Sequence, residues 1–122
     1  MEKTLTIDGR EVRFKSTAAT PLRYKAQFGK DYFSEILKME SLANVKQGKV
    51  SSKDIQKIDF EIFYNIIWVL AKTADRNIKE PMEWLDGFDE FPLMEIIPEL
   101  QDLIASATFK VLLKVQTIFE ST

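Results

Sequence analysis

The chain has 122 residues, of which 45% are hydrophobic and 30% charged, and a net charge of −2. These values fit one globular domain and exclude a disordered chain. The absence of cysteine and histidine excludes disulfides and cysteine zinc sites, and removes the commonest general base and metal ligand. The longest uncharged run, residues 62–71, is about half a membrane span, and the N-terminus lacks a signal-peptide core. We therefore expect a cytoplasmic, non-enzymatic, single-domain protein without a cofactor or metal.

Charge is divided unevenly along the chain. Residues 1–57 hold twelve lysines and arginines against seven acidic residues, whereas residues 58–122 hold five against twelve. This division favours head-to-tail self-association or the attraction of an acidic partner to the first half, although ordinary solvated surfaces also account for it.

Residues 4–15 show the pattern of a β-hairpin. Two runs, TLTI and EVRFK, alternate apolar and polar residues on either side of Asp8-Gly9. This dipeptide favours the tight turn that needs positive φ angles. An isolated hairpin is barely stable, so we expect its apolar face to rest on a helix or on another chain.

The stretch TPLRYKAQFGKDYF, residues 20–33, predicts two helices in series, over residues 21–28 and 31–44. Thr20 is the expected N-cap of the first helix and Pro21 its first residue. Gly29 suits a left-handed residue that ends this helix, and Asp31 suits the N-cap of the next. The alternative is one helix with an internal glycine, at a cost of about 1 kcal/mol relative to alanine.

A polar loop over residues 44–52 separates these helices from a predicted helix at residues 53–74, with Ser51-Ser52 as its cap. This helix has two adjacent apolar stripes: Ile55, Ile58, Ile62, Ile66, Val69 and Ala74 in one, and Phe60, Phe63, Ile67 and Leu70 in the other. A helix so apolar is central in the fold or is covered by a partner.

The last part of the chain predicts three further helices, over residues 81–87, 92–104 and 107–119. Pro81 suits the start and Gly87 the end of the first, with Trp84 as an anchor. Pro98 must kink or split the second. With no internal repeat or linker, residues 1–122 form one mainly α domain with an N-terminal β-hairpin, and we expect its core to centre on Ile62, Ile66, Trp68 and Trp84.

Two patterns carry weak signals for chemistry. Asp86, Asp89 and Glu90 lie close together, which suits cation binding or acid/base catalysis, but helix capping and solvation are the favoured explanation. Basic and aromatic residues alternate between positions 23 and 33, as in nucleic-acid binders: Arg23, Tyr24, Lys25, Phe28, Lys30, Tyr32 and Phe33. Helical spacing buries half of these aromatics, which favours core packing with a basic outer face.

The order of these segments resembles the tail assembly chaperones of long-tailed bacteriophages and of prophages of Gram-positive bacteria. The resemblance covers nearly the whole chain. Its most specific parts are Tyr24-x-x-x-Phe28-Gly29-Lys30-Asp31, Trp68 with Ala71-Lys72, and Trp84-Leu85-Asp86-x-Phe88. Because these are packing and turn residues, the resemblance concerns a scaffold and names no reactive site.

The resemblance implies a protein that binds the tape measure protein, keeps it soluble and assists assembly of the tail tube around it in the host bacterial cytoplasm. Members of the family are not expected in the mature virion. They often have a longer form, made by ribosomal frameshifting, that recruits the tail tube protein.

The apolar faces suit an amphipathic helix of the partner lying in a groove. The expected partner-binding residues are Phe63, Ile67, Phe109, Leu112, Leu113 and Phe119, although they would equally close the core. The alternative function is that of a small phage or prophage regulator that binds nucleic acid through residues 21–44. A carboxylate enzyme would need Asp86 and Glu90 to face a pocket.

Overall fold

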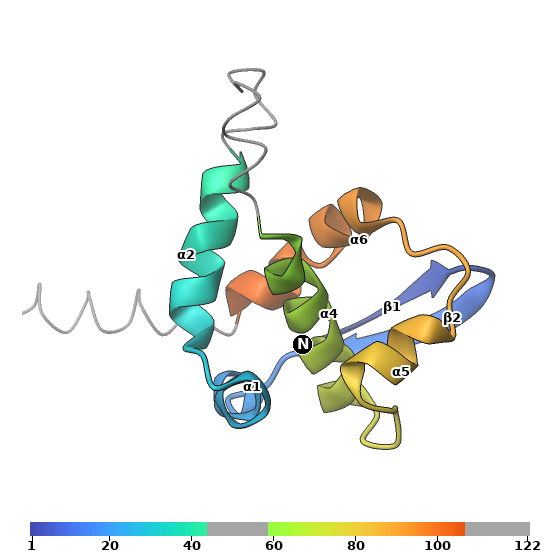
Figure 1. The fold of residues 1–122 in the computed structure, drawn as a ribbon, viewed down its shortest axis with the longest axis horizontal. Helices are drawn as coiled ribbons and strands as arrows, with labels where there is room; N and C mark the ends of the chain where they lie inside the picture. Colours follow the sequence, from blue (N-terminus) through green and yellow to red (C-terminus); the bar gives the residue numbers. More distant parts are fainter. Residues whose placement is uncertain (44–58, 107–122) are drawn as a thin grey trace, which may run out of the picture.

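The computed structural model describes residues 1–43 and 59–106 (Figure 1). Its elements are β1 (Glu2–Ile7), β2 (Arg10–Lys15), α1 (Thr20–Phe28), α2 (Tyr32–Ala43), α4 (Phe60–Ala74), α5 (Pro81–Asp86) and α6 (Leu93–Glu99), followed by helical residues 101–106. The predicted fold class, mainly α with an N-terminal β-hairpin, is confirmed. No helix in the described ranges is long and apolar enough to cross a membrane.

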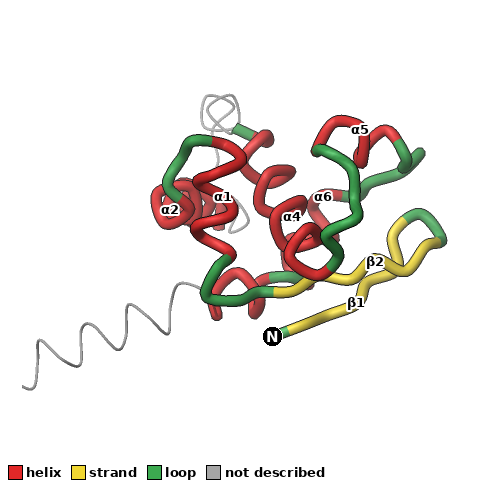
Figure 2. Tube along the Cα trace, turned by 90° about the horizontal axis from the view of Figure 1, so that it is seen from below, coloured by secondary structure: helices red, strands yellow, loops and turns green. Residues whose placement is uncertain are grey.

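The hairpin forms where the sequence predicts it. Asp8 and Gly9 both have positive φ angles, 53° and 73°, as the two-residue turn requires. The strands are antiparallel, with Leu5 opposite Val12. The inner face of β2 packs against α4, so the expected support of the hairpin by a helix is confirmed (Figure 2).

The elbow between α1 and α2 is also as predicted. Gly29 is left-handed, with φ 68°, and its N–H donates to the carbonyl of Lys25. The carboxylate of Asp31 accepts hydrogen bonds from the N–H and the hydroxyl of Ser34, at 2.9 and 3.0 Å. The glycine therefore ends one helix and the aspartate caps the next.

The predicted start of α1 is wrong by one residue. Ala19 is the N-cap, Thr20 is already helical, and Pro21 occupies the second position. The hydroxyl of Thr20 accepts a hydrogen bond from the N–H of Thr17 at 3.0 Å, so it closes the preceding turn and does not cap the helix.

The most apolar helix, α4, lies at the centre of the fold, but it begins later than predicted. Asp59 is extended, with φ −93° and ψ 97°, and its carboxylate accepts a hydrogen bond from the N–H of Glu61. This cap interrupts the predicted helix 53–74, of which residues 53–58 lie outside the described residues. Ile62, Ile66 and Trp68 are in the core, as predicted.

The C-terminal half shows one difference and one expected break. Trp84 is only half-buried and packs at the edge of the core, not in its centre. The predicted helix 92–104 is split, because α6 ends at Glu99, Leu100 forms a turn and the helix resumes at residue 101. Pro98 lies inside α6, two residues before this turn, and its ring and missing N–H weaken a helix at that point. The predicted loop 44–52 and helix 107–119 lie outside the described residues.

Candidate binding surface

Of the six partner-binding residues expected from the sequence, the structure describes two, and both are buried. Phe63 and Ile67 on α4 are 3% and 0% exposed and belong to the core. They are buried because α1, α2, α6 and the hairpin all pack around α4. The other four, Phe109, Leu112, Leu113 and Phe119, lie outside the described residues. The predicted groove therefore stays a prediction, and in this conformation Phe63 and Ile67 are not available to a partner.

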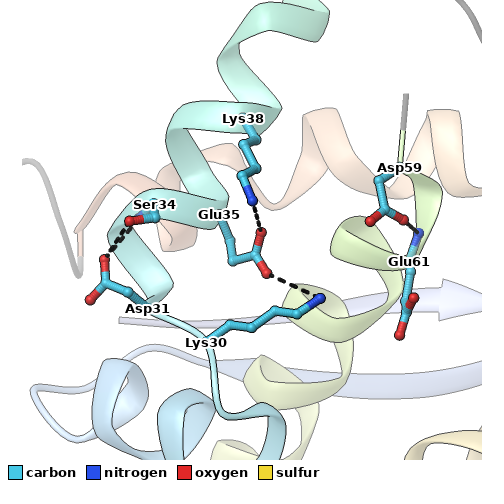
Figure 3. A network of polar contacts seen from close by, with 7 residues as sticks. All are labelled: Lys30, Asp31, Ser34, Glu35, Lys38, Asp59 and Glu61. Carbon is cyan, nitrogen blue, oxygen red and sulfur yellow. Dashed lines mark hydrogen bonds and ion pairs between the residues drawn. The ribbon is translucent and has the colours of Figure 1, made fainter. Parts of the chain in front are cut away.

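A buried carboxylate lies between α2 and its neighbours (Figure 3). The side chain of Glu35 is only 2% exposed. Its oxygens are 3.7 Å from the Lys38 ammonium and 3.9 Å from that of Lys30, and neither oxygen has a hydrogen-bond partner. At these distances the two lysines offset the buried charge by Coulomb attraction, without the added stabilisation of short hydrogen bonds.

Two buried tyrosines lie on α1 and α2 in the same part of the fold. The rings of Tyr24 and Tyr32 are 5.2 Å apart. The Tyr32 hydroxyl has no hydrogen-bond partner among the described residues, whereas the Tyr24 hydroxyl has Asn65 as a hydrogen-bonding neighbour. Burial raises the pKa of both hydroxyls well above the ordinary value, and the charge of Glu35 adds to the rise for Tyr24. Both therefore stay neutral. Because their rings are inaccessible, they cannot stack on bases, which weighs against the nucleic-acid hypothesis for this region.

Asp31 and Asp59, also drawn in Figure 3, are exposed and act as helix caps. The N–H and hydroxyl of Ser34 donate to Asp31 and hold the pKa of that carboxyl below its ordinary value. Asp59 accepts from the N–H of Glu61 at 3.0 Å. In the described part of the chain, no three carboxylates are grouped so as to hold a metal ion.

A partly open cavity of about 200 Å³ lies between β2, the end of α4 and α5. Its lining combines apolar and charged side chains: Arg10, Glu11, Val12, Arg13, Ala71, Asp75, Ile78, Trp84 and Phe88. Small-molecule sites usually measure about 300 to 1,000 Å³. This cavity is therefore suited to one side chain of a partner.

The tip of the hairpin closes one end of the cavity. The Arg10 guanidinium lies 4.1 Å from the centre of the Phe88 ring and donates a hydrogen bond to the carbonyl of Gly87. The N–H of Asp89 donates to the carboxylate of Asp8 at 2.9 Å. These contacts fix the turn of the hairpin to the segment that follows α5.

The aromatic wall of the cavity is rigidly built. Trp84, Phe88 and Phe91 contact each other edge to face, with ring centres 5.2 to 5.8 Å apart. The indole N–H of Trp68 donates to the carbonyl of Lys79 at 2.9 Å, which ties the segment before α5 to α4. Trp84 and Phe88 therefore keep their positions without a ligand.

The sequence did not reveal this cavity. It marked Trp84 as an anchor, but the contacts of Arg10 and Asp8 join residues that are 77 and 81 positions apart in the chain. Nothing in the local pattern around the turn indicates such partners. The suspected acidic cluster of Asp86, Asp89 and Glu90 does not line the cavity, and all three residues are exposed.

Large apolar side chains are also exposed on several helices. They are Leu22 on α1, Leu37 on α2, Phe60 on α4, Met82 on α5 and Met94 on α6. Single exposed apolar residues are normal on a soluble protein, so none of them alone defines a binding site.

Comparison with protein-family models, with curated proteins and with solved structures found no match to this chain.

Proposed function

We propose that this chain is a phage tail assembly chaperone that binds the tape measure protein and assists assembly of the tail tube. The support comes from the residues that carry the resemblance to this family. Tyr24 and Phe28 have ring centres 4.8 Å apart, and Phe28 contacts Trp68 edge to face at 5.7 Å. Residues from distant segments of the motif thus pack in one place.

The backbone supports the same proposal. Gly29 occupies a left-handed position, and Asp31 caps α2. Another motif residue, Lys72, donates to the carbonyls of Arg76 and Ile78 at 2.8 and 2.9 Å. Each of these motif positions has a physical reason for its residue type. The resemblance therefore rests on residues that build the scaffold, and this is the observation that carries the proposal.

The proposed partner is a long, largely apolar, helix-forming chain. A protein that coats such a chain needs apolar contacts that tolerate many sequences, and exposed methionine and leucine side chains adapt well to this task. Met82, Met94, Leu22 and Leu37 are each more than half exposed. The groove expected around Phe63, Ile67 and residues 109–119 remains part of the proposal, but α4 would have to be partly uncovered to admit a partner helix.

Further partners follow from the same proposal. They are the tail tube protein, recruited through a longer frameshifted form, and other copies of this chain. The place of action is the host bacterial cytoplasm, and the chain is absent from the finished virion.

Co-expression with the tape measure protein of the same genome tests the proposal. We expect the tape measure protein to be more soluble with this chain than without it, and the two to co-purify. If neither effect occurs, the chaperone proposal is wrong. Salt-dependent binding of duplex DNA by the chain alone would instead support the regulator, because phosphate contacts release counterions.

A further inference from the structure

The outer edge of β2 is free to bind another strand. The N–H of Ser16 donates to the carbonyl of Met1 at 2.9 Å, and the N-terminal amine donates back at 3.2 Å, so these two residues form a bonded pair. Bonded and non-bonded pairs alternate along an antiparallel ladder. Given the observed register, the backbone N–H and C=O groups of Glu11 and Arg13 point away from β1. Nothing in the described ranges forms a hydrogen bond with them.

The cavity lies along this free edge. Residues 10–13 of β2 form one side, and Trp84 and Phe88 form the opposite wall. Ala71 and Ile78 supply an apolar surface between the two sides. An unpaired strand edge that faces an aromatic wall is the arrangement by which other proteins bind extended peptides, with main-chain bonds to the edge and one side chain in a pocket.

We propose that an extended segment of a protein partner adds to β2 as a third, antiparallel strand and places one large apolar side chain in the cavity. Side chains directly opposite each other in a sheet lie on the same face. The partner residue opposite Val12 therefore points into the cavity, towards Ala71 and Trp84. Its two neighbours lie on the solvent face, beside the side chains of Glu11 and Arg13.

The charges on β2 favour particular residue types in the partner, on either side of the apolar residue that enters the cavity (the apolar anchor). Arg13 already forms an ion pair with Glu2 at 3.0 Å, whereas no ion pair involves Glu11 within the described residues. The cavity lining holds two acidic side chains, Glu11 and Asp75, and two basic ones, Arg10 and Arg13. Because Arg13 is already paired, a lysine or arginine of the partner beside Glu11 complements that carboxylate, and an acidic residue there is repelled. The bound segment is thus basic, apolar and extended.

This inference rests on the proposed function only in the choice of partner, since a tape measure protein offers many apolar segments. The probe is a short capped peptide of threonine and lysine with one central leucine. Calorimetry should show binding, and NMR should show protection of the Glu11 and Arg13 amides from exchange and a shift of the Trp84 indole signal. A peptide with aspartate in place of the central leucine should not bind.

Two modifications separate strand addition from simple filling of the cavity. N-methylation of the two peptide groups that face β2 keeps every side chain but removes their N–H donors, and should weaken binding about tenfold or more. In the protein, Glu11→Pro removes an outward N–H that the hairpin does not use, and should abolish binding. Its matched control is Thr6→Pro, because Thr6 is opposite Glu11 on the other strand and its N–H points to the other edge.

Several results would overturn the inference. They are the absence of peptide binding to the unmodified protein, equal binding of the N-methylated peptide, and equal effects of Glu11→Pro and Thr6→Pro. If either variant fails to fold, the peptide series on the unmodified protein decides. The inference is also refuted if the parent chain self-associates but does not bind the peptide, and if Glu11→Pro no longer self-associates. That result would assign the β2 edge to a second copy of this chain.

The same variants separate this inference from the proposed function. If the tape measure protein co-purifies equally with the parent chain and with Glu11→Pro, the β2 edge is not its binding site, although the chaperone proposal stands. If the peptide binds but the tape measure protein does not co-purify, the chaperone proposal fails and the strand-binding edge remains.

Discussion

The two sides of α4 are built differently. On the side of the hairpin and α5, the Trp68 indole bonds to the carbonyl of Lys79, and the half-buried Lys72 bonds to two carbonyls. The Ser16 hydroxyl, directly after β2, is buried there without a partner. On the side of α1 and α2, polar atoms of Arg23, Tyr32 and Glu35 are buried without hydrogen-bond partners. Most buried polar groups in proteins are paired, so the second side departs from the usual rule.

This difference predicts which parts of the fold have high and which have low local stability. A buried polar atom without a partner costs about 1 to 3 kcal/mol. The hairpin side carries this cost at the Ser16 hydroxyl alone among the described residues, whereas the α1–α2 side carries it at several atoms. We therefore expect amide hydrogen exchange to be slower at the hydrogen-bonded amides of β2 and in the second half of α4 than in α1 and α2.

The largest effect is expected at Trp68, which is in the core and is bonded to the segment before α5. Trp68→Ala should lower the free energy of unfolding by about 3 to 5 kcal/mol, because it leaves a cavity and removes a satisfied hydrogen bond. Urea unfolding measures the loss. Trp84→Ala, at a half-buried position, is the control and should cost less. A loss below about 1 kcal/mol at Trp68 would contradict the placement.

A smaller loss is expected at the elbow between α1 and α2. Gly29→Val should cost about 1 to 2 kcal/mol, because a left-handed backbone brings Cβ close to the following carbonyl. Space around Gly29 is open, so strain of the backbone alone is measured. Gly29→Asn is the matched control and should cost less, because asparagine tolerates this conformation. Equal stability of the valine variant would mean that the elbow can relax.

Local chemistry explains which parts of the fold could be predicted. Asp8-Gly9, Gly29 and Asp31 act within a few residues of themselves, through positive φ angles or a cap, and all three predictions are confirmed. Thr20 does not cap the helix, because its hydroxyl accepts a hydrogen bond from the N–H of Thr17. The sequence alone does not rank such short-range alternatives.

Tertiary contacts explain what could not be predicted. The apolar pattern placed Phe63 and Ile67 on a stripe that suited a partner or a core equally, and only the packing of α1, α2 and the hairpin decides for the core. The cavity depends on the contact of Arg10 with Phe88, which periodicity cannot show. The free edge of β2 likewise depends on which element lies beside it.

Removing one unpaired hydroxyl should stabilise the protein. Tyr32→Phe keeps the ring that contacts Tyr24 and deletes an oxygen that has no partner. We expect a gain of about 1 kcal/mol in the free energy of unfolding. Tyr64→Phe is the control, because Tyr64 is only half-buried beside Phe91 and its hydroxyl is not an unpaired buried group. A loss of stability in Tyr32→Phe would show that this hydroxyl is bonded in solution, and the contrast between the two sides of α4 would weaken.

The smallest effect is expected at the exposed cap of α2, and it should depend on pH. Hydrogen bonds from Ser34 hold the pKa of Asp31 below its ordinary value of 3.8, so the folded state favours the charged carboxylate. The stabilisation is therefore complete above that value and is lost as the pH falls through the lower pKa of the folded state. Asp31→Ala should be less stable than the parent chain at neutral pH, and the difference should shrink in acid. Asp31→Asn, which keeps an acceptor but does not titrate, should lose less and show no such dependence at this site. A difference between the parent chain and Asp31→Ala that stays constant down to acidic pH would show that the charge of Asp31 contributes nothing to the cap.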